Sequence, residues 1–164
     1  MTVFLCGFMG CGKSTAGREL ARMTGRKFTD MDKYIEDEVK LTIPEIFAEK
    51  GEHFFRAAET DAVRSLALTG GIVACGGGAM LKAENADIAR ENGKVIFIDV
   101  PFDVCYSRIE GDTNRPVVMS NSKESLHDIY NVRRPVYIEN SDASADGDGT
   151  PQEIAERIRI LCGI

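Results

Sequence analysis

A glycine-rich segment near the start of the chain places the strongest constraint on how the chain can fold. Residues 7–14 read Gly-Phe-Met-Gly-Cys-Gly-Lys-Ser and directly follow the apolar run Val3–Cys6. The spacing matches G-x-x-x-x-G-K-[ST], in which backbone amides cradle phosphates, the lysine reaches the outer phosphates and the hydroxyl binds Mg²⁺. Glycines let the amides turn inward, and a helix that begins at the lysine directs its positive end at the anion. The segment therefore predicts a strand, a phosphate-binding loop, a helix and a bound nucleotide.

Short apolar runs alternate with helical patterns along the whole chain of 164 residues, which is typical of βαβ units and a parallel sheet. We expect one domain over residues 1–164, because no linker, repeat or low-complexity tract divides the chain. Ligands of such sheets bind at the carboxyl ends of the strands, so the residues after each strand are the candidates for a site. The expected strands are Val3–Cys6, Lys27–Thr29, Ile72–Cys75, Val95–Asp99 and, more weakly marked, Ala143–Ala145.

Charge and hydropathy argue against two classes of partner. The net charge of −6 is unfavourable for nucleic-acid binding, because phosphate contacts need clustered Lys and Arg. No apolar stretch reaches the length needed to cross a bilayer, and no basic region precedes the first apolar run. We therefore expect a cytoplasmic protein with no nucleic acid and no membrane as partner. The short chain without an evident sticky face favours a monomer.

The five cysteines form no C-x-x-C pair and no zinc-ligand spacing, so we expect reduced thiols. Three of them lie in apolar runs, where small buried thiols are common. Cys11 differs because it lies inside the phosphate loop near a helix N-terminus, which can lower a thiol pKa. For this residue both a redox role and the role of an ordinary small loop residue are open.

Two carboxylates follow the second expected strand. On a continuing strand Asp30 and Asp32 would point to one side and Met31 to the other, so that the two could share a magnesium ion and a substrate. The alternative is a helix N-cap, because a helical pattern begins at Lys33. The nearby phosphate loop favours the functional interpretation.

An arginine and a glutamate lie three residues apart in the next helical region. A short helix as far as Gly51 and then a longer helix are expected here. Arg56 and Glu59 share one face of the longer helix and can pair. Such pairs are usually exposed and weak. Phe47 and Phe55, however, offer apolar walls beside the arginine, which is unusual for a purely solvated residue.

Three further segments contain candidate site residues. Residues 76–78 are consecutive glycines after the third strand, which indicates a tight turn or a backbone that a ligand approaches closely. Residues 111–116 are polar and rich in turn-forming residues, so they are expected to form a mobile loop. Its arginine, Arg115, is either a lid residue or simply solvated. The adjacent Arg133 and Arg134 point in different directions on a helix, so one can face a site while the other meets solvent.

In this order, the motifs resemble those of the shikimate kinases, a compact family of kinases with the phosphate loop. Any one of the motifs is a weak signal, but together they separate this family from gluconate kinases and adenylate kinases, which share the first motif. The resemblance covers essentially the whole chain. Its motifs are residues 7–15, Asp30-x-Asp32, residues 51–59, residues 76–79, Asn114-Arg115-Pro116 and Arg133-x-Pro135-x-Tyr137.

The resemblance implies an α/β fold of the three-layer P-loop kinase type, with a five-stranded parallel sheet in the order 2-3-1-4-5. It also implies a substrate-binding helical segment at about residues 31–61 and a lid at about residues 111–123. The implied activity is ATP-dependent phosphorylation of the 3-hydroxyl of shikimate, which gives shikimate 3-phosphate and ADP in chorismate and aromatic amino-acid biosynthesis. ATP and Mg²⁺ are the implied cofactors, and shikimate is the implied small-molecule substrate.

Residue roles follow by matching motif positions. Lys13, Asp32 and Arg115 are the implied catalytic residues, with Asp32 as a possible base. The implied ligands of ATP are Gly10, Cys11, Gly12, Lys13, Ser14, Thr15 and Arg115, with Arg108 and Pro151 on either side of the adenine and with Ser14 and Asp30 on Mg²⁺. The implied contacts of shikimate are Asp32, the carboxylate clamp Arg56 and Arg133, the backbone of Gly76, Gly77 and Gly78, the walls Phe47 and Phe55, and Glu59, which would orient Arg56.

The residues also fit this chemistry without the resemblance, because phosphoryl transfer needs positioning and charge neutralisation, and planar guanidinium groups match a carboxylate. Two other classes of function are less consistent with the sequence. A GTPase-type switch needs Asn-Lys-x-Asp to read its base, and this tetrapeptide does not occur. A silent binding protein of the same fold is expected to have lost Lys13, Asp32 or a clamp arginine, and all are present. Among kinases, the alternative is a sugar-acid kinase of the gluconate type.

Overall fold

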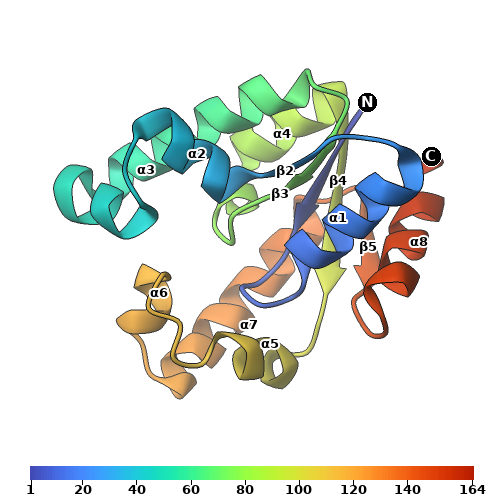
Figure 1. Cartoon of the computed structure of the whole chain (residues 1–164). Coiled ribbons are helices and arrows are strands. Elements are labelled where there is room, and N and C mark those ends of the chain that lie inside the picture. Colours follow the sequence, from blue (N-terminus) through green and yellow to red (C-terminus); the bar gives the residue numbers. More distant parts are fainter.

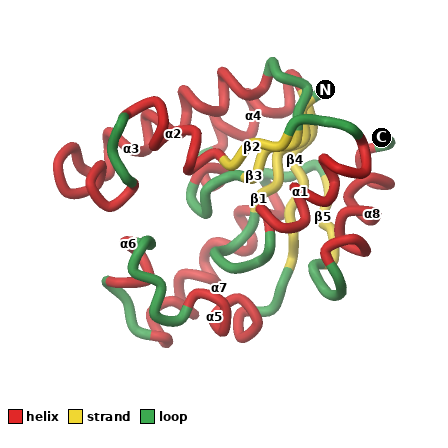
Figure 2. Tube along the Cα trace, viewed as in Figure 1, coloured by secondary structure: helices red, strands yellow, loops and turns green.

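The computed structural model describes residues 1–164 and has a central parallel sheet with helices on both faces (Figure 1 and Figure 2). The strands pair in the order β2-β3-β1-β4-β5, and every pairing is parallel. This confirms the predicted fold class and strand order. The strands are β1 (Thr2–Cys6), β2 (Phe28–Asp30), β3 (Ile72–Ala74), β4 (Gly93–Asp99) and β5 (Ala143–Asp146).

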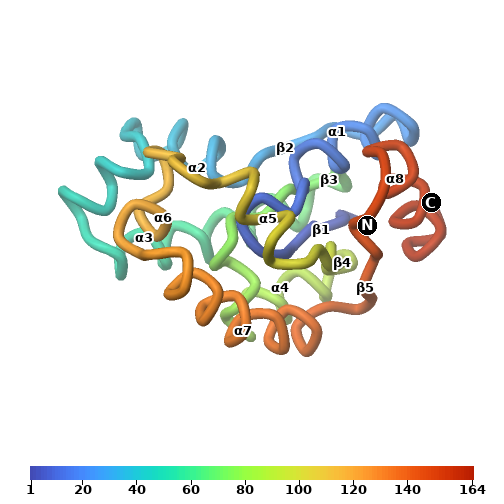
Figure 3. The backbone as a smooth tube through the Cα atoms, turned by 90° about the horizontal axis from the view of Figure 1, so that it is seen from below, coloured from blue at the N-terminus to red at the C-terminus, as the bar shows by residue number.

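Two groups of helices cover the sheet. Helices α1 and α8 pack together on one face, whereas α3 and α4 pack together on the other, where α7 also lies (Figure 3). No helix is both long and apolar enough to span a membrane. The helices are α1 (Lys13–Thr24), α2 (Met31–Val39), α3 (Ile43–Ala67), α4 (Ala83–Asn92), α5 (Phe102–Ile109), α6 (Pro116–Met119), α7 (Lys123–Glu139) and α8 (Pro151–Cys162), with a short 3-10 helix at Ala79–Leu81.

The core lies along the central strands. Every residue of β1 and β3 is buried, and β4 is buried from Val95 to Ile98. Helices on both faces explain why these strands are continuous apolar runs in the sequence and do not alternate with polar residues. Edge strand β2 is only partly buried, which agrees with its weaker apolar pattern.

The carboxyl ends of the strands face away from the two chain termini (Figure 1). The phosphate loop follows β1 at this edge and packs against α5. A Cβ at Gly10 would lie 2.6 Å from the carbonyl oxygen of Cys105, and its φ is 79°, so only glycine fits. Gly10 is therefore needed for the loop to pack closely against α5, in addition to the part that glycines play in binding phosphate.

Several boundaries differ from the sequence-based predictions. Helix α2 begins at Met31 and not at Lys33, and β2 extends to Asp30. The predicted break at Gly51 is confirmed, because this residue interrupts α3 with φ 81° and ψ 169°. Pro135 lies inside α7, and the helix continues through it to Glu139. Helices α4 and α6 were not predicted.

Candidate active site

The phosphate loop presents unused backbone donors at the start of α1. Gly12 caps this helix without a side-chain hydrogen bond, so the first-turn N–H groups are available to an anion. The Lys13 ammonium donates to the carbonyl oxygens of Gly7 at 2.9 Å and Phe8 at 3.1 Å, and lies 3.7 Å from the sulfur of Cys11. Cys11 is a free thiol only 1% exposed. The loop therefore combines a cation with inward amides, as its motif predicts.

Asp30 joins the phosphate loop to α2. Its Oδ2 accepts from the Ser14 hydroxyl at 2.8 Å, and its Oδ1 caps α2 by accepting from the amides of Asp32 at 3.1 Å and Lys33 at 3.4 Å. The predicted same-side placement by strand alternation is wrong, because the strand ends at Asp30 and Asp32 lies in the first turn of a helix. Asp30 is thus the N-cap of α2, as the alternative interpretation predicted, and its role at a metal site stays a prediction. Its carboxylate and the Ser14 hydroxyl are the oxygen ligands that Mg²⁺ prefers beside phosphate groups.

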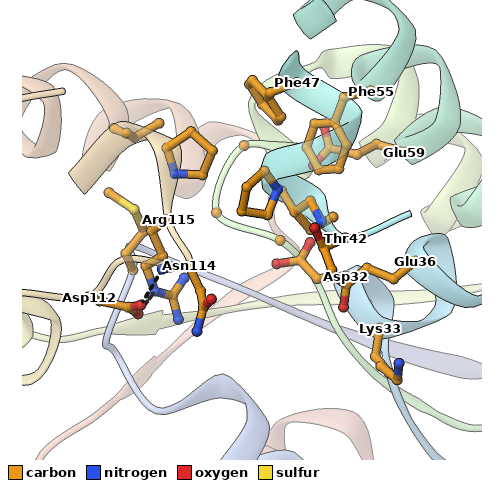
Figure 4. Close-up of a pocket in the computed structure, with 18 of the residues that line it drawn as sticks. Asp32, Lys33, Glu36, Thr42, Phe47, Phe55, Glu59, Asp112, Asn114 and Arg115 are labelled. Atoms are coloured by element: carbon orange, nitrogen blue, oxygen red, sulfur yellow. Dashed lines mark hydrogen bonds and ion pairs between the residues drawn. The ribbon is translucent and has the colours of Figure 1, made fainter. Parts of the chain in front are cut away.

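A cavity of about 550 Å³ opens next to this loop. Figure 4 shows Asp112 and Arg115 on one side of it and Asp32 and Glu59 on the other. Its walls come from the phosphate loop, α2, α3, the glycine turn after β3, the predicted lid and α7. The predicted site residues that line it are Asp30, Asp32, Phe47, Phe55, Arg56, Glu59, Gly76, Gly77, Gly78, Arg115 and Arg133.

Arg56 and Glu59 form the predicted pair, at 2.7 Å between Nη1 and Oε2. The glutamate side chain is only 1% exposed, so this is not an ordinary surface ion pair. Glu52 holds the other terminal nitrogen of the arginine at 3.3 Å. The guanidinium lies so close to Gly78 that a Cβ there would collide with it. Arg56 is thus held rigidly against the glycine turn.

Asp32 and Glu59 each have one unpartnered carboxylate oxygen, and the two oxygens lie close together beside Gly76. Asp32 Oδ1 and Glu59 Oε1 are buried without a hydrogen-bond partner. A Cβ on Gly76 would lie 2.6 Å from the first and 3.2 Å from the second, so both converge over this glycine. Burial raises the pKa of Asp32, and the neighbouring Asp30 raises it further. Burial also raises the pKa of Glu59, against the opposing charge of Arg56. Buried acceptors of this kind are satisfied by a donor from a ligand, from water or from a proton shared between the two carboxyl groups.

The two adjacent arginines of α7 have different partners. Arg133 lines the cavity. Arg134 makes a bidentate pair with Asp99 at the end of β4, at 3.0 Å and 2.6 Å, so it is engaged and not simply solvated. The hydroxyl of Tyr137 donates to the carbonyl of Gly77 and ties the helix to the glycine turn. These contacts hold α7 with Arg133 toward the cavity.

Arg115 lines the cavity from the side of the predicted lid. Its Nε donates to Asp112 Oδ2 at 2.9 Å. Within this loop, α6 begins at Pro116, whose fixed φ suits the first position of a helix. Residues 111–115 contain no helix, as expected of a loop, and the rest of the predicted lid contains one helical turn.

The residues predicted to hold adenine lie outside the cavity. Arg108 lies over the phosphate loop, where its Nη1 donates to the carbonyl of Gly10 at 2.9 Å. Pro151 is the exposed first residue of α8. Their placement on either side of the base stays a prediction.

The chain is similar in sequence to the shikimate kinases over almost its whole length. The sequence profile of the shikimate kinases matches residues 9–162. The shikimate kinase of Streptococcus gordonii is 39% identical over 165 aligned residues, which cover 98% of this chain and 100% of that protein. The chain belongs to the shikimate kinase family. The family member from Geobacter sulfurreducens is 42% identical over 137 residues, which cover 82% of this chain and 76% of its own.

Solved structures agree with this assignment. A shikimate kinase from Acinetobacter baumannii in complex with shikimate is 33% identical, with a TM-score of 0.92 over 99% of this chain and 93% of its own. A gluconokinase from Sinorhizobium meliloti is 16% identical, with a TM-score of 0.56, over 99% of this chain and 93% of its own, and shows the fold alone. Shikimate kinases, and not gluconate kinases, are therefore the family of this chain.

The sequence reasoning missed several residues of the cavity in this family member. Glu36 lies one helical turn after Asp32, so the i, i+4 rule finds it once the start of α2 is known. Lys33 and Thr42 also line the cavity. Asp112 showed no signal beyond the turn-forming composition of its loop, yet it contacts a predicted catalytic residue.

Proposed function

We propose that this shikimate kinase transfers the γ-phosphate of ATP to the 3-hydroxyl of shikimate in the cavity at the carboxyl edge of the sheet. One observation carries the proposal. A single cavity beside the phosphate loop contains two arginines, an unpartnered carboxylate oxygen and an arginine of the predicted lid. Shikimate offers one carboxylate and three hydroxyls, which match these groups.

The phosphate loop would hold the ATP phosphates. The backbone amides of residues 10–15 would donate hydrogen bonds to the phosphate oxygens, and Lys13 would exchange its contacts with Gly7 and Phe8 for phosphate oxygens. Ser14 and Asp30 would hold Mg²⁺, which supplies neutralisation of phosphate charge. We also propose that Arg108 and Pro151 lie on either side of the adenine.

The other end of the cavity would hold shikimate. Arg56 and Arg133 would bind its carboxylate, since guanidinium groups pair with carboxylates in a planar, two-bond geometry. Glu59 would keep Arg56 in place through their buried pair. Phe47 and Phe55, with ring centres 4.9 Å apart, would provide an apolar wall. Asp32 Oδ1, now without a partner, would accept from the hydroxyl that attacks the phosphorus.

Arg115 would complete the neutralisation. The charge that develops on the transferring phosphoryl group needs cations beyond Lys13, and Arg115 reaches into the cavity from the predicted lid, residues 111–123. We further propose a single kinase domain over the whole chain, with residues 31–61 as its substrate-binding segment. We propose that it acts as a cytoplasmic monomer without a nucleic-acid or membrane partner.

An assay that couples ADP release to NADH oxidation tests the proposal. With ATP and Mg²⁺, the purified protein should release ADP with shikimate and not with gluconate, and the product should carry its phosphate on the 3-hydroxyl by NMR. Chelation of the metal should stop the reaction. Equal turnover of gluconate, or no turnover of shikimate by the folded protein, would contradict the proposed substrate.

A further inference from the structure

The arginine of the predicted lid has one side-chain partner, and it lies on the same segment. Asp112 Oδ2 accepts from Arg115 Nε at 2.9 Å, while Asp112 Oδ1 accepts from the backbone N–H of Asn114, also at 2.9 Å. Both carboxylate oxygens are therefore used, one to shape the turn and one to hold the arginine. Figure 4 shows the Asp112–Arg115 pair at the edge of the cavity.

The contact leaves the reactive end of the arginine free. Arg115 uses only Nε, the nitrogen nearest to its side-chain stem, so both terminal nitrogens remain available. An arginine held at Nε has lost much of its rotamer freedom before any ligand arrives, which lowers the entropic cost of placing it on a phosphoryl group. The pair is partly exposed, at 39% for Arg115 and 30% for Asp112, so its effect is one of orientation more than stability.

The pair does not fasten the predicted lid to the rest of the protein. Asp112 and Arg115 lie three residues apart in one loop, so their contact moves with the loop and persists when the loop shifts. A restraining latch would need a partner on another element. A contact within the loop cannot hold the loop in place, but it can fix the direction of the arginine side chain.

We propose that Asp112 is a positioning residue that orients Arg115 toward the transferring phosphoryl group. The inference rests on the proposed function, because Arg115 must act in phosphoryl transfer for its orientation to matter. Asp112 itself touches neither ligand in this scheme and acts through the arginine.

Single variants give the first test. Asp112→Ala should lower kcat about fivefold or more, since a freed arginine must be ordered in each cycle. Shikimate affinity without nucleotide, measured by calorimetry, should stay within about twofold, because the clamp arginines are untouched. Asp112→Asn keeps one acceptor oxygen and should have an intermediate kcat. Glu110→Ala removes the same charge from an exposed residue two positions away and is the matched control, with wild-type kcat expected.

A double-mutant cycle separates orientation from mere support of the loop. In an Arg115→Ala background, Asp112→Ala should cause no further loss of kcat, because the group that it orients is gone. An equal loss in both backgrounds, a kcat within twofold of wild type, or a rise in kcat for Asp112→Ala would overturn the inference. Failure of the proposed function is a distinct result: the wild-type protein would not phosphorylate shikimate, or Arg115→Ala alone would leave kcat unchanged.

Discussion

Asp32 is the residue at which stability and activity conflict most directly. Its Oδ1 is buried without a partner, and desolvation raises the pKa of its carboxyl group. Desolvation therefore makes the ionised form of Asp32 less favourable in the folded protein than in the unfolded chain. Such a cost is expected where a site is prepared for a ligand that will supply the missing donor.

The substitution Asp32→Asn should stabilise the ligand-free protein and impair catalysis. With the folded pKa above the ordinary value of 3.8, the stability contribution of Asp32 is complete below that pH and is lost as the pH rises through the folded pKa. The melting temperature of Asp32→Asn should therefore exceed that of wild type at pH 7, and the difference should vanish below about pH 4. The exposed Asp103→Asn is the control, for which a much smaller shift is expected.

The kinetics of the same variant identify the role of Asp32. Loss of a general base should lower kcat about 100-fold or more. A normal kcat with a raised KM would mean that Asp32 positions shikimate and does not take its proton. A melting temperature below wild type at pH 7 would contradict the desolvation argument.

At the scale of elements, the site depends on how helices are held against the glycine turn. Helix α3 presents Arg56 through its pair with Glu59, and α7 presents Arg133. The bidentate pair of Arg134 with Asp99 anchors α7 to the end of β4. The two arginines of the proposed carboxylate clamp therefore come from elements that are far apart in the sequence.

Removal of a clamp arginine should weaken shikimate binding. Hydrogen bonds to charged groups contribute roughly 1.5–3 kcal/mol, so Arg56→Ala or Arg133→Ala should raise the Kd for shikimate by about tenfold or more. Arg22→Ala is the matched control, because this exposed arginine of α1 pairs with Glu19 on its own helix, lies outside the cavity and should change the Kd by less than about threefold. Titration calorimetry measures all three. Unchanged affinity in both clamp variants would rule out the carboxylate site.

The predicted lid should act on a later step. Arg115→Ala should lower kcat by about 100-fold, because an arginine that engages the phosphoryl group stabilises the transition state more than the ground state. Shikimate affinity without nucleotide should change by less than about threefold. Steady-state kinetics and calorimetry together check this pattern. A collapse of the binary affinity with kcat preserved would instead place Arg115 in the carboxylate clamp.

At the scale of the whole molecule, the buried polar groups of the cavity lower the free energy of unfolding, and ligand binding raises it. Carboxylates converge over Gly76 and arginines line the same cavity, so buried polar groups face one another there. Because ligand binding and folding are linked, the effect of a ligand at this cavity can be measured as a change in protein stability. Any ligand that binds only the folded state raises the melting temperature.

Shikimate alone should stabilise the protein before ATP is added. A ligand at about 100 times its Kd adds about 2.7 kcal/mol of stability, which corresponds to a rise in Tm of roughly 5–10 °C for a chain of this size. Differential scanning fluorimetry can measure the shift, with gluconate as the comparison. At the same shikimate concentration, a tenfold higher Kd in Arg56→Ala should reduce the shift to about half. An equal shift with gluconate would contradict the selectivity of the cavity.

Local patterns in the sequence were sufficient to predict the phosphate loop, the five strands along the chain and the break at Gly51, but not helices α4 and α6. These features depend on glycine geometry, on capping and on apolar periodicity, which act over a few residues. The parallel sheet followed from the alternation of the elements. With the motifs in order, the same reasoning also led to the family.

Only the tertiary structure decided which neighbouring polar groups meet. Asp32 lies in a helix and not in a strand, because Asp30 accepts hydrogen bonds from the amides of Asp32 and Lys33 and so caps α2. Arg134 pairs with Asp99 at the end of β4 while Arg133 lines the cavity, and the pairing of Asp112 with Arg115 depends on the shape of one turn. Which polar side chains come into contact depends on differences of a few ångströms in their positions and on how deeply they are buried. These are properties of the packed chain that no local pattern encodes.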